Sequence, residues 1–398
     1  MPIDSWSNIS RRDFAVSVAG LALGPISYST RTLKAEPAEK AAPVGEQSSV
    51  KAETTDVYDR AIVIDCLATP ASFNVPYPPL GPLSAEQLDN VAKSGLTAVN
   101  VTISGNGRSF EDAIRNIALW QNEASVHSGQ FLLVRGGGDI TLAKKERKLG
   151  LILGFQDGEM IGRDLSLLDV FHKLGVRVIQ PTYNVRNLIG DGCLEVGDAG
   201  LSSFGRQVVH RMNELGIALD LSHCGRRTTA DGIAASAGPV IISHSGCAAV
   251  HKNPRNKEDR ELKALAERGG VFGIYLMPYL GNDGSPYPTK EMFLAHLRHA
   301  LDVCGTNHVG IGSDQSITPV VETAEYLKAW KEGGESRKRL GYEAPDEAGR
   351  FPYMAAINTP RRLEVIASEM GKMGYPASAV EKVIGENFLR VFQEIWKT

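Results

Sequence analysis

Ile217-Ala218-Leu219-Asp220-Leu221-Ser222-His223 and Val240-Ile241-Ile242-Ser243-His244-Ser245 are two apolar runs of this 398-residue chain, and in both of them Ser-His follows the apolar residues. Apolar runs of this length, bounded by glycine and proline, are typical of buried strands in a parallel sheet. A polar residue just beyond the carboxyl end of such a strand lies where α/β barrels place their chemistry. Two imidazoles from consecutive strand ends could therefore meet on one metal ion.

Six other runs have the same apolar character, and helical patterns separate most of them. Eight strand-helix units in order favour a closed (β/α)8 barrel of the TIM type over an open doubly wound sheet. The loop after Asp65 is rich in proline, unlike the Gly-rich phosphate turn of an open sheet. Residues 316–352 are polar and are expected to be irregular, and helices are expected at 359–373 and 377–396. The six runs are residues 61–65, 95–103, 149–155, 176–180, 270–276 and 308–314.

Composition is that of an ordinary globular protein, with 42% hydrophobic and 22% charged residues. The net charge of -3 gives no reason to expect nucleic acid as a partner. The five cysteines are scattered without a CxxC pair, so they do not predict a disulfide framework. We expect a single barrel domain over residues 56–398.

The N-terminus differs from the rest of the chain. Arg11-Arg12-Asp13-Phe14 precedes a short, weakly apolar run, a pattern that resembles a twin-arginine export signal. We therefore expect an export signal at 1–29, a flexible linker at 30–55, the twin-arginine translocation machinery as a partner and a periplasmic or otherwise exported location. A disordered basic tail is the alternative. The run is too short and too rich in Gly and Ala for a stable membrane span.

In a barrel, the carboxyl ends of the strands lie on one rim. A neutral imidazole binds Zn, Fe or Mn, and a catalytic metal needs about three protein ligands and an open position for water. A carboxylate after the eighth strand could carry the proton, and a guanidinium after the sixth could bind a substrate carboxylate. Hydrogen-bonded structural histidines, a barrel-closing carboxylate and an exposed basic loop are the alternatives. The rim residues are Asp65, Gln156, Tyr183, His223, His244 and Asp314, with Arg255 in the loop after the sixth strand.

From about residue 56 to 392 the chain resembles the membrane dipeptidase (renal dipeptidase, M19) family of amidohydrolase-type barrels. That family hydrolyses dipeptides, some β-lactams and related amides with two bridged zinc ions. The resemblance implies that His223 and His244 hold the second metal, that Asp314 is the proton shuttle and that Arg255 binds the substrate carboxylate, with Asn256 and Tyr183 beside it. The stretches that carry the resemblance are Leu201-Ser202-Ser203-Phe204-Gly205, Leu219-Asp220-Leu221-Ser222-His223, Ile242-Ser243-His244-Ser245, Arg255-Asn256, Gly310-Ile311-Gly312-Ser313-Asp314 and Gly385-Glu386-Asn387-Phe388-Leu389-Arg390-Val391-Phe392.

The chain departs from the family at the first metal site. The family's Asp-Gly-His-x-Asp pattern is here Asp65-Cys66-Leu67-Ala68-Thr69, so Leu67 and Thr69 stand where a His and an Asp would bind metal. The family's bridging Glu falls on Gln156, and a further family His falls on Tyr183. We therefore expect one zinc ion, bound by His223 and His244, and at most a second ion that is bound weakly. Gln156 is the expected third ligand, with Asp157, Glu159 or Cys66 as alternatives.

Three functions follow from these departures. The first is an exported, metal-dependent, dipeptidase-like hydrolase that cleaves a dipeptide or small peptide-like amide with metal-activated water. The second is a re-purposed pocket that acts without hydrolysis on an exported peptide metabolite, with Tyr183 and Cys66 as reactive groups. The third is a catalytically inactive binding protein. Members of the family are often dimers, so a homodimer is also an open alternative.

Overall fold

The computed structural model describes residues 57–72, 82–104 and 109–396, so the predicted export signal (1–29) and linker (30–55) lie outside the described residues. Eight parallel strands build the barrel, and each lies within one of the eight runs expected from the sequence. They are β1 (Ile64–Asp65), β3 (Ala98–Thr102), β5 (Leu149–Phe155), β6 (Val176–Ile179), β7 (Ala218–Leu219), β8 (Ile241–Ser245), β9 (Val271–Ile274) and β10 (Val309–Ile311).

Backbone pairing closes these strands into a ring. Parallel ladders join β1, β3, β5, β6 and β7 in that order, and a second set joins β8, β9 and β10. A parallel bridge between Asp220 and Ile241 links β7 to β8. The amide of Cys66 donates to the carbonyl of Ile311 at 2.9 Å and links β10 back to β1. Beyond the carboxyl ends of β1 and β10, the short strands β2 (Ala68–Thr69) and β11 (Gln315–Ser316) pair with each other.

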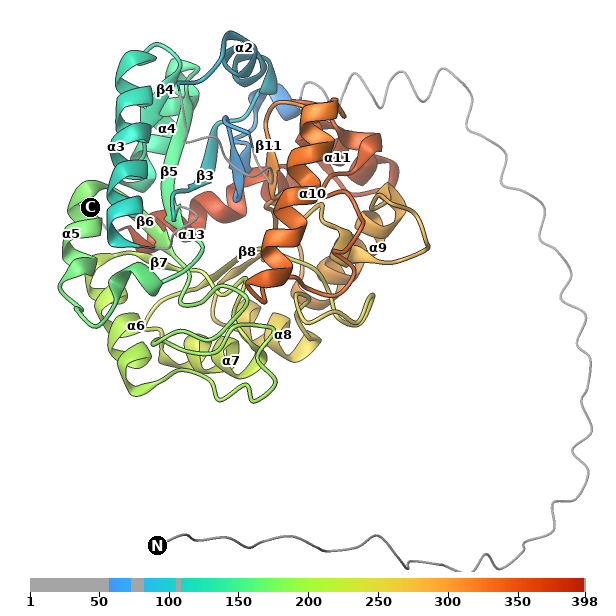
Figure 1. The fold of residues 1–398 in the computed structure, drawn as a ribbon. Coiled ribbons are helices and arrows are strands. Elements are labelled where there is room, and N and C mark those ends of the chain that lie inside the picture. The colour runs from blue at the N-terminus through green and yellow to red at the C-terminus, as the bar shows by residue number, and fades with distance from the viewer. Residues whose placement is uncertain (1–56, 73–81, 105–108, 397–398) are drawn as a thin grey trace, which may run out of the picture. The chain divides into compact units, whose positions relative to one another are not determined.

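Helices surround the strands (Figure 1). Several begin where the sequence places a capping residue, because a side-chain oxygen there accepts a free backbone N–H of the first turn. Ser84 caps α2 and Ser202 caps α6. The helices are α2 (Ala85–Ser94), α3 (Phe110–Val126), α4 (Gly137–Glu146), α5 (Leu167–Leu174), α6 (Ser203–Leu215), α7 (Arg226–Ala235), α8 (Asp259–Glu267), α9 (Lys290–Cys304), α10 (Ala324–Arg339), α11 (Arg362–Lys372), α12 (Ala377–Glu381) and α13 (Asn387–Ile395), with the short turns η1 (Glu159–Ile161), η2 (Pro278–Leu280), η3 (Ala355–Ile357) and η4 (Lys382–Glu386).

The core has two parts. The larger cluster joins the strands to the surrounding helices. The smaller one takes residues such as Ile64, Ile152 and Val271 from the strands and packs them against aromatic rings of α13. A Cβ at Gly310 would lie 2.3 Å from the Phe388 ring, so only a glycine lets β10 approach this helix. The C-terminal helix therefore packs against the amino-terminal end of the barrel, and the predicted rim residues follow the strands at the other end.

One expectation about the elements was wrong. Residues 316–352 are not irregular throughout, because α10 lies within them and is capped by Thr323. None of the residues of α10 is buried, so this helix has no apolar period to reveal it. A short strand, β4 (Phe131–Leu133), also pairs with β5 and was not expected. Among the described residues, no helix combines the length and the apolar character that crossing a membrane requires.

Candidate active site

The two Ser-His stretches meet at the carboxyl ends of β7 and β8. Asp220 follows β7 and lies fully buried, and its carboxylate accepts both hydroxyl groups of Ser222 and Ser243 at 2.5 Å. The backbone amides of the same two serines donate to it as well, at 3.1 and 3.0 Å. This carboxylate therefore joins the two strand ends and fixes the backbone that carries His223 and His244.

Hydrogen bonds set the tautomers of both imidazoles. The hydroxyl proton of Ser243 goes to Asp220, so its oxygen accepts from Nδ1–H of His244, 2.7 Å away. Nδ1 of His223 lies 2.6 Å from the side-chain oxygen of Asn184, which can only accept. In both rings Nε2 is therefore the unprotonated nitrogen. Burial, and then the positive charge of Arg255, holds the pKa of both imidazoles well below the usual value and keeps them neutral.

The two Nε2 atoms face one another at 3.0 Å, and Oε1 of Gln156 lies 3.1 Å from that of His223. Three electron-pair donors thus converge with no proton of their own between them. Arg255, only 1% exposed, directs its Nη2 to His223 Nε2 at 3.3 Å and its Nη1 to the Ser222 carbonyl at 2.6 Å. Among the described residues, Arg255 donates to this group through His223 alone, and a cation would compensate the lone pairs of His244 and Gln156 that face it.

This donor set fits one metal ion, held by His223, His244 and Gln156, although the neutral amide oxygen of Gln156 is a weaker ligand than a carboxylate. The fit does not extend to a second ion. Leu67 is buried and apolar, and the hydroxyl of Thr69 accepts the amide of Ala71 at 3.2 Å. Across the ranges that the structure describes, no three His, Cys, Asp or Glu side chains are grouped as a metal site.

Asp157, Glu159 and Cys66, the alternative third ligands, therefore do not join the histidines. Asp157 instead accepts Asn187 Nδ2 at 2.8 Å, and Glu159 is exposed. Cys66 is packed within the smaller core cluster. Burial raises the pKa of its thiol well above the usual value, which disfavours the reactive thiolate.

Two carboxyl groups lie at the seam where the barrel closes. The amide of Asp314 donates to the carbonyl of Leu67 at 2.8 Å, and the next amide back, of Ser313, donates to Asp65 at 2.7 Å. The other oxygen of Asp65 is buried and has no hydrogen-bond partner among the described residues. Burial raises the pKa of Asp65 to about 6 and that of Asp314 to about 7, against the opposing effect of nearby arginines. Asp314 is thus able to change protonation near neutral pH.

Tyr183 lies flat against His223, with ring centroids 4.0 Å apart at 22°. Its hydroxyl accepts from Arg337 of α10 at 2.9 Å. Asn256, by contrast, is used by the protein itself: its amide donates to the carbonyls of His251 and Tyr279, and its oxygen accepts the Tyr275 hydroxyl. The structure thus places Tyr183 beside His223, whereas the hydrogen bonds of Asn256 do not favour a contact with substrate.

The sequence did not indicate Asn184 or Arg337 as parts of the site. Asn184 is the residue after Tyr183 and begins a long loop, and long loops in compact domains are often functional. Its place at the start of this long loop was the one signal in the sequence that could have indicated a role for Asn184. Arg337 is one of several basic residues near the end of α10, and nothing in the sequence distinguishes it from its neighbours.

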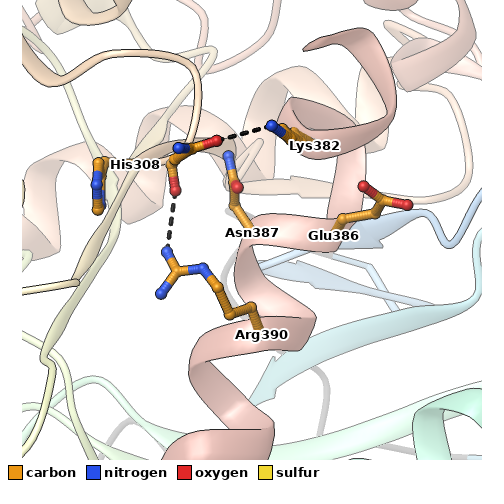
Figure 2. A pocket seen from close by; sticks show the side chains of 6 residues that line it. His308, Lys382, Glu386, Asn387 and Arg390 are labelled. Atoms are coloured by element: carbon orange, nitrogen blue, oxygen red, sulfur yellow. Dashed lines mark hydrogen bonds between the residues drawn. The ribbon is translucent and has the colours of Figure 1, made fainter. Parts of the chain in front are cut away.

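A separate pocket lies at the opposite end of the barrel, between the start of β10 and the junction of η4 with α13 (Figure 2). Its basic side chains hold the local backbone and polar groups together. Lys382 donates to the Asn307 side chain, and Arg390 donates to the carbonyls of Gly269 and Asn307, each at 2.9 Å. These bonds fasten α13 under the barrel, so we assign this pocket a structural role.

Comparison with known proteins agrees with the barrel and its rim. The model of the membrane dipeptidase family, peptidase family M19, matches residues 85–331. The chain is 30% identical to Dipeptidase verJ of Clonostachys rogersoniana over 68% of this chain and 61% of that protein. It is 26% identical to Dipeptidase tcpJ of Claviceps purpurea over 72% of this chain and 60% of that one. The matches therefore span about three-fifths of the length of these two curated relatives.

Among solved structures, an amidohydrolase from Pseudomonas aeruginosa superposes with a TM-score of 0.70 and 29% identity, over 87% of this chain and 99% of that one. The family model covers more than half of the chain. The protein therefore belongs to the membrane dipeptidase family, as its motifs indicated, and its fold is the metal-dependent hydrolase barrel of that family. Metal dependence and hydrolysis are properties of the family, and the chemistry of this member depends on its altered site.

Proposed function

We propose that this protein is an exported hydrolase that cleaves a dipeptide or small peptide-like amide with a free carboxylate, using one metal ion. The observation that carries the proposal is the pair of unprotonated Nε2 atoms of His223 and His244, 3.0 Å apart, with the Gln156 oxygen beside them. The other ring nitrogen of each histidine, Nδ1, is already used in a hydrogen bond, to Asn184 in His223 and to Ser243 in His244. A site built only for structure has no need of two lone pairs that face one another.

The bound metal would make a water molecule acidic enough to attack a carbonyl near neutral pH. Asp314 supports the proton transfers, because a carboxyl group with a pKa of about 7 can accept a proton from the nucleophile and return it to the leaving amine. Its backbone adopts the left-handed conformation, with φ of 60°. Removing Asp314 therefore leaves the metal ligands in place but removes the proton carrier.

Arg255 supports recognition of the substrate carboxylate. Its guanidinium is buried between Tyr275 and Tyr279, with ring centroids 5.8 and 5.9 Å away. Within the described residues no carboxylate forms an ion pair with it. A buried cation is costly unless an anion compensates it, and the planar fork of an arginine suits a carboxylate. A substrate with a free carboxylate would supply that charge.

The test is elemental analysis of the exported protein together with the variant His223→Ala. We expect about one equivalent of metal and turnover of dipeptides in the wild type, and loss of both in the variant. His210→Ala is the matched control, since His210 lies exposed on α6 and should change neither. Full activity of the metal-free protein would refute the metal-dependent mechanism.

A second candidate is binding or non-hydrolytic chemistry on a peptide-like metabolite. The specific observation in its favour is that, within the described residues, no carboxylate joins the two histidines as a metal ligand. Gln156 stands in place of the family's Glu, and Leu67 and Thr69 in place of its His and Asp. It predicts that dipeptides or related peptides raise the thermal unfolding temperature while no hydrolysis occurs at any metal loading. Turnover that depends on added metal would exclude it.

Export by the twin-arginine route rests on Arg11-Arg12 and the apolar run after them. The double variant Arg11→Lys/Arg12→Lys should leave the protein in the cytoplasm, whereas Arg31→Lys, beyond the predicted signal, should not change its location. Cell fractionation with a reporter fusion measures this. Export of the double variant at the wild-type level would contradict the proposed route.

A further inference from the structure

His223 is held on two sides by groups that do not belong to the barrel strands. On each side, a chain of contacts connects His223 to residues 337–347. We call these residues the clamp segment; it begins at the end of α10. We propose that the clamp segment, through Arg337 and the Tyr342 carbonyl, positions the imidazole of His223. The inference goes beyond the proposed function and uses its assignment of His223 as a metal ligand.

The first route passes through Tyr183. Its ring covers one face of the His223 ring, and its hydroxyl accepts from Nη1 of Arg337 at 2.9 Å. Arg337 is itself fixed, because its Nε and Nη2 both donate to the carboxylate of Glu347. That carboxylate also accepts the Tyr279 hydroxyl at 2.8 Å. The aromatic ring against His223 is thus tied to a fixed ion pair.

The second route passes through Asn184. Its oxygen accepts Nδ1–H of His223 at 2.6 Å, while its amide nitrogen donates to the carbonyl of Tyr342 at 2.7 Å. Nη2 of Arg337 donates to the same carbonyl at 3.1 Å. Because the Tyr342 carbonyl can only accept, it makes Asn184 present its oxygen, and not its amide nitrogen, to His223. This orientation decides which nitrogen of His223 keeps its lone pair.

The two routes share Arg337, so one side chain influences both the plane and the tautomer of the imidazole. Groups that bond the second nitrogen of a metal-binding histidine fix its orientation, and their loss typically weakens metal binding about 10- to 100-fold. Arg337, Tyr342 and Glu347 lie beyond the part of the chain that the family model matches, residues 85–331. We therefore assign Arg337 and Asn184 as positioning residues for the imidazole of His223.

The experiment compares Arg337→Met with Arg339→Met, a matched change at an exposed arginine two residues along. The first readout is the tautomer of His223 by nitrogen NMR of histidine-labelled protein without metal. The second is the zinc dissociation constant by chelator competition. Arg337→Met should mix the Nε2–H tautomer into a state that is otherwise Nδ1–H and should raise the dissociation constant about tenfold. Arg339→Met should change neither quantity.

Two further variants separate the routes. Tyr183→Phe removes only the hydroxyl that Arg337 binds and should raise the zinc dissociation constant without changing the tautomer. Asn184→Leu should change the tautomer and weaken zinc about 10- to 100-fold, and Asn184→Asp, which keeps an acceptor for Nδ1–H, should restore the tautomer. Circular dichroism reports whether Arg337→Met is folded. If it is not, the Tyr183 and Asn184 variants still test the inference.

The inference is overturned if folded Arg337→Met and Asn184→Leu both keep the wild-type tautomer, whatever the metal does. If the tautomer shifts as expected while the wild type takes up no zinc, positioning stands and the metal-dependent function fails. If zinc binds the wild type and all variants equally, positioning fails and the function stands.

Discussion

At the scale of single residues, Gln156 is the proposed third metal ligand, and its charge would set how strongly the site holds a metal ion. Its oxygen lies 3.1 Å from His223 Nε2 but carries no charge. A carboxylate there would neutralise part of the charge of a metal ion and offset the nearby Arg255. We predict that Gln156→Glu lowers the metal dissociation constant at least about tenfold, or about 1.4 kcal/mol, as measured by chelator competition.

The matched control for that change is Gln156→Met, which keeps the length of the side chain and removes the oxygen. It should weaken metal binding, since only the two imidazoles remain. If the Glu and Met variants bind metal with equal affinity, Gln156 does not contact the ion, and the three-ligand assignment is wrong.

Asp314 is the residue whose loss should separate metal binding from catalysis. The variant Asp314→Asn keeps the size of the side chain, and asparagine tolerates the left-handed backbone at this position. We expect kcat/KM for a dipeptide to fall about 10²- to 10⁴-fold at unchanged metal content. In the wild type the pH profile should show a limb near pH 7, from the raised pKa of this carboxyl group. Retention of full activity would exclude Asp314 as the proton carrier.

At the scale of elements, η4 shows how tightly the C-terminal helices close the barrel. A Cβ at Gly385 would lie 2.1 Å from the carbonyl oxygen of Ile62, which is backbone and cannot move aside. Gly385→Ala should therefore lower the free energy of unfolding by about 1–3 kcal/mol or more, as measured by urea denaturation. The contact involves backbone on one side, so repacking of side chains cannot relieve it.

Gly334 on α10 provides the opposite case for the same substitution. A Cβ there meets nothing within 4 Å, so Gly334→Ala should stabilise α10 by about 0.5–1 kcal/mol through helix propensity alone. Equal effects of the two alanines on unfolding would contradict the close packing of η4 on β1.

The strands were predictable from the sequence because burial on both faces makes each of them a continuous apolar run. Leu149–Phe155 is buried at every position and was expected with these bounds. The histidines were predictable because they follow such runs. Asn184 and Arg337 were not, since Asn184 reaches His223 across 39 positions of the chain and Arg337 reaches Tyr183 across 154. The polar surface of α10 likewise gave no periodic pattern to recognise.

At the scale of the whole molecule, buried titratable groups at the barrel rim make stability depend on pH in two opposing ways. Between about pH 4 and 7 the folded protein keeps protons on Asp65 and Asp314 that the unfolded chain releases, because burial raises both pKa values. The free energy of unfolding therefore falls as pH rises through this window. His223 and His244 act oppositely below about pH 6.5, where the unfolded chain binds protons that the folded one does not.

Asp314→Asn isolates one of these contributions. The stability of the variant relative to the wild type should increase as pH rises from about 4 to 7 and should then level off, by more than about 1.4 kcal/mol in total. Urea denaturation at several pH values measures this difference. A difference that does not vary with pH would show that the carboxyl group ionises with equal ease in the folded and unfolded chains.

The left-handed backbone of Asp314 also has an evolutionary consequence. Asparagine and glycine adopt this conformation readily, and a single nucleotide change converts an aspartate codon to either of them. A lineage could thus lose the carboxylate in one mutational step and still inherit a barrel that folds. Such a change would remove the proposed proton carrier while keeping a residue that suits the left-handed backbone, so activity could be lost without loss of the fold.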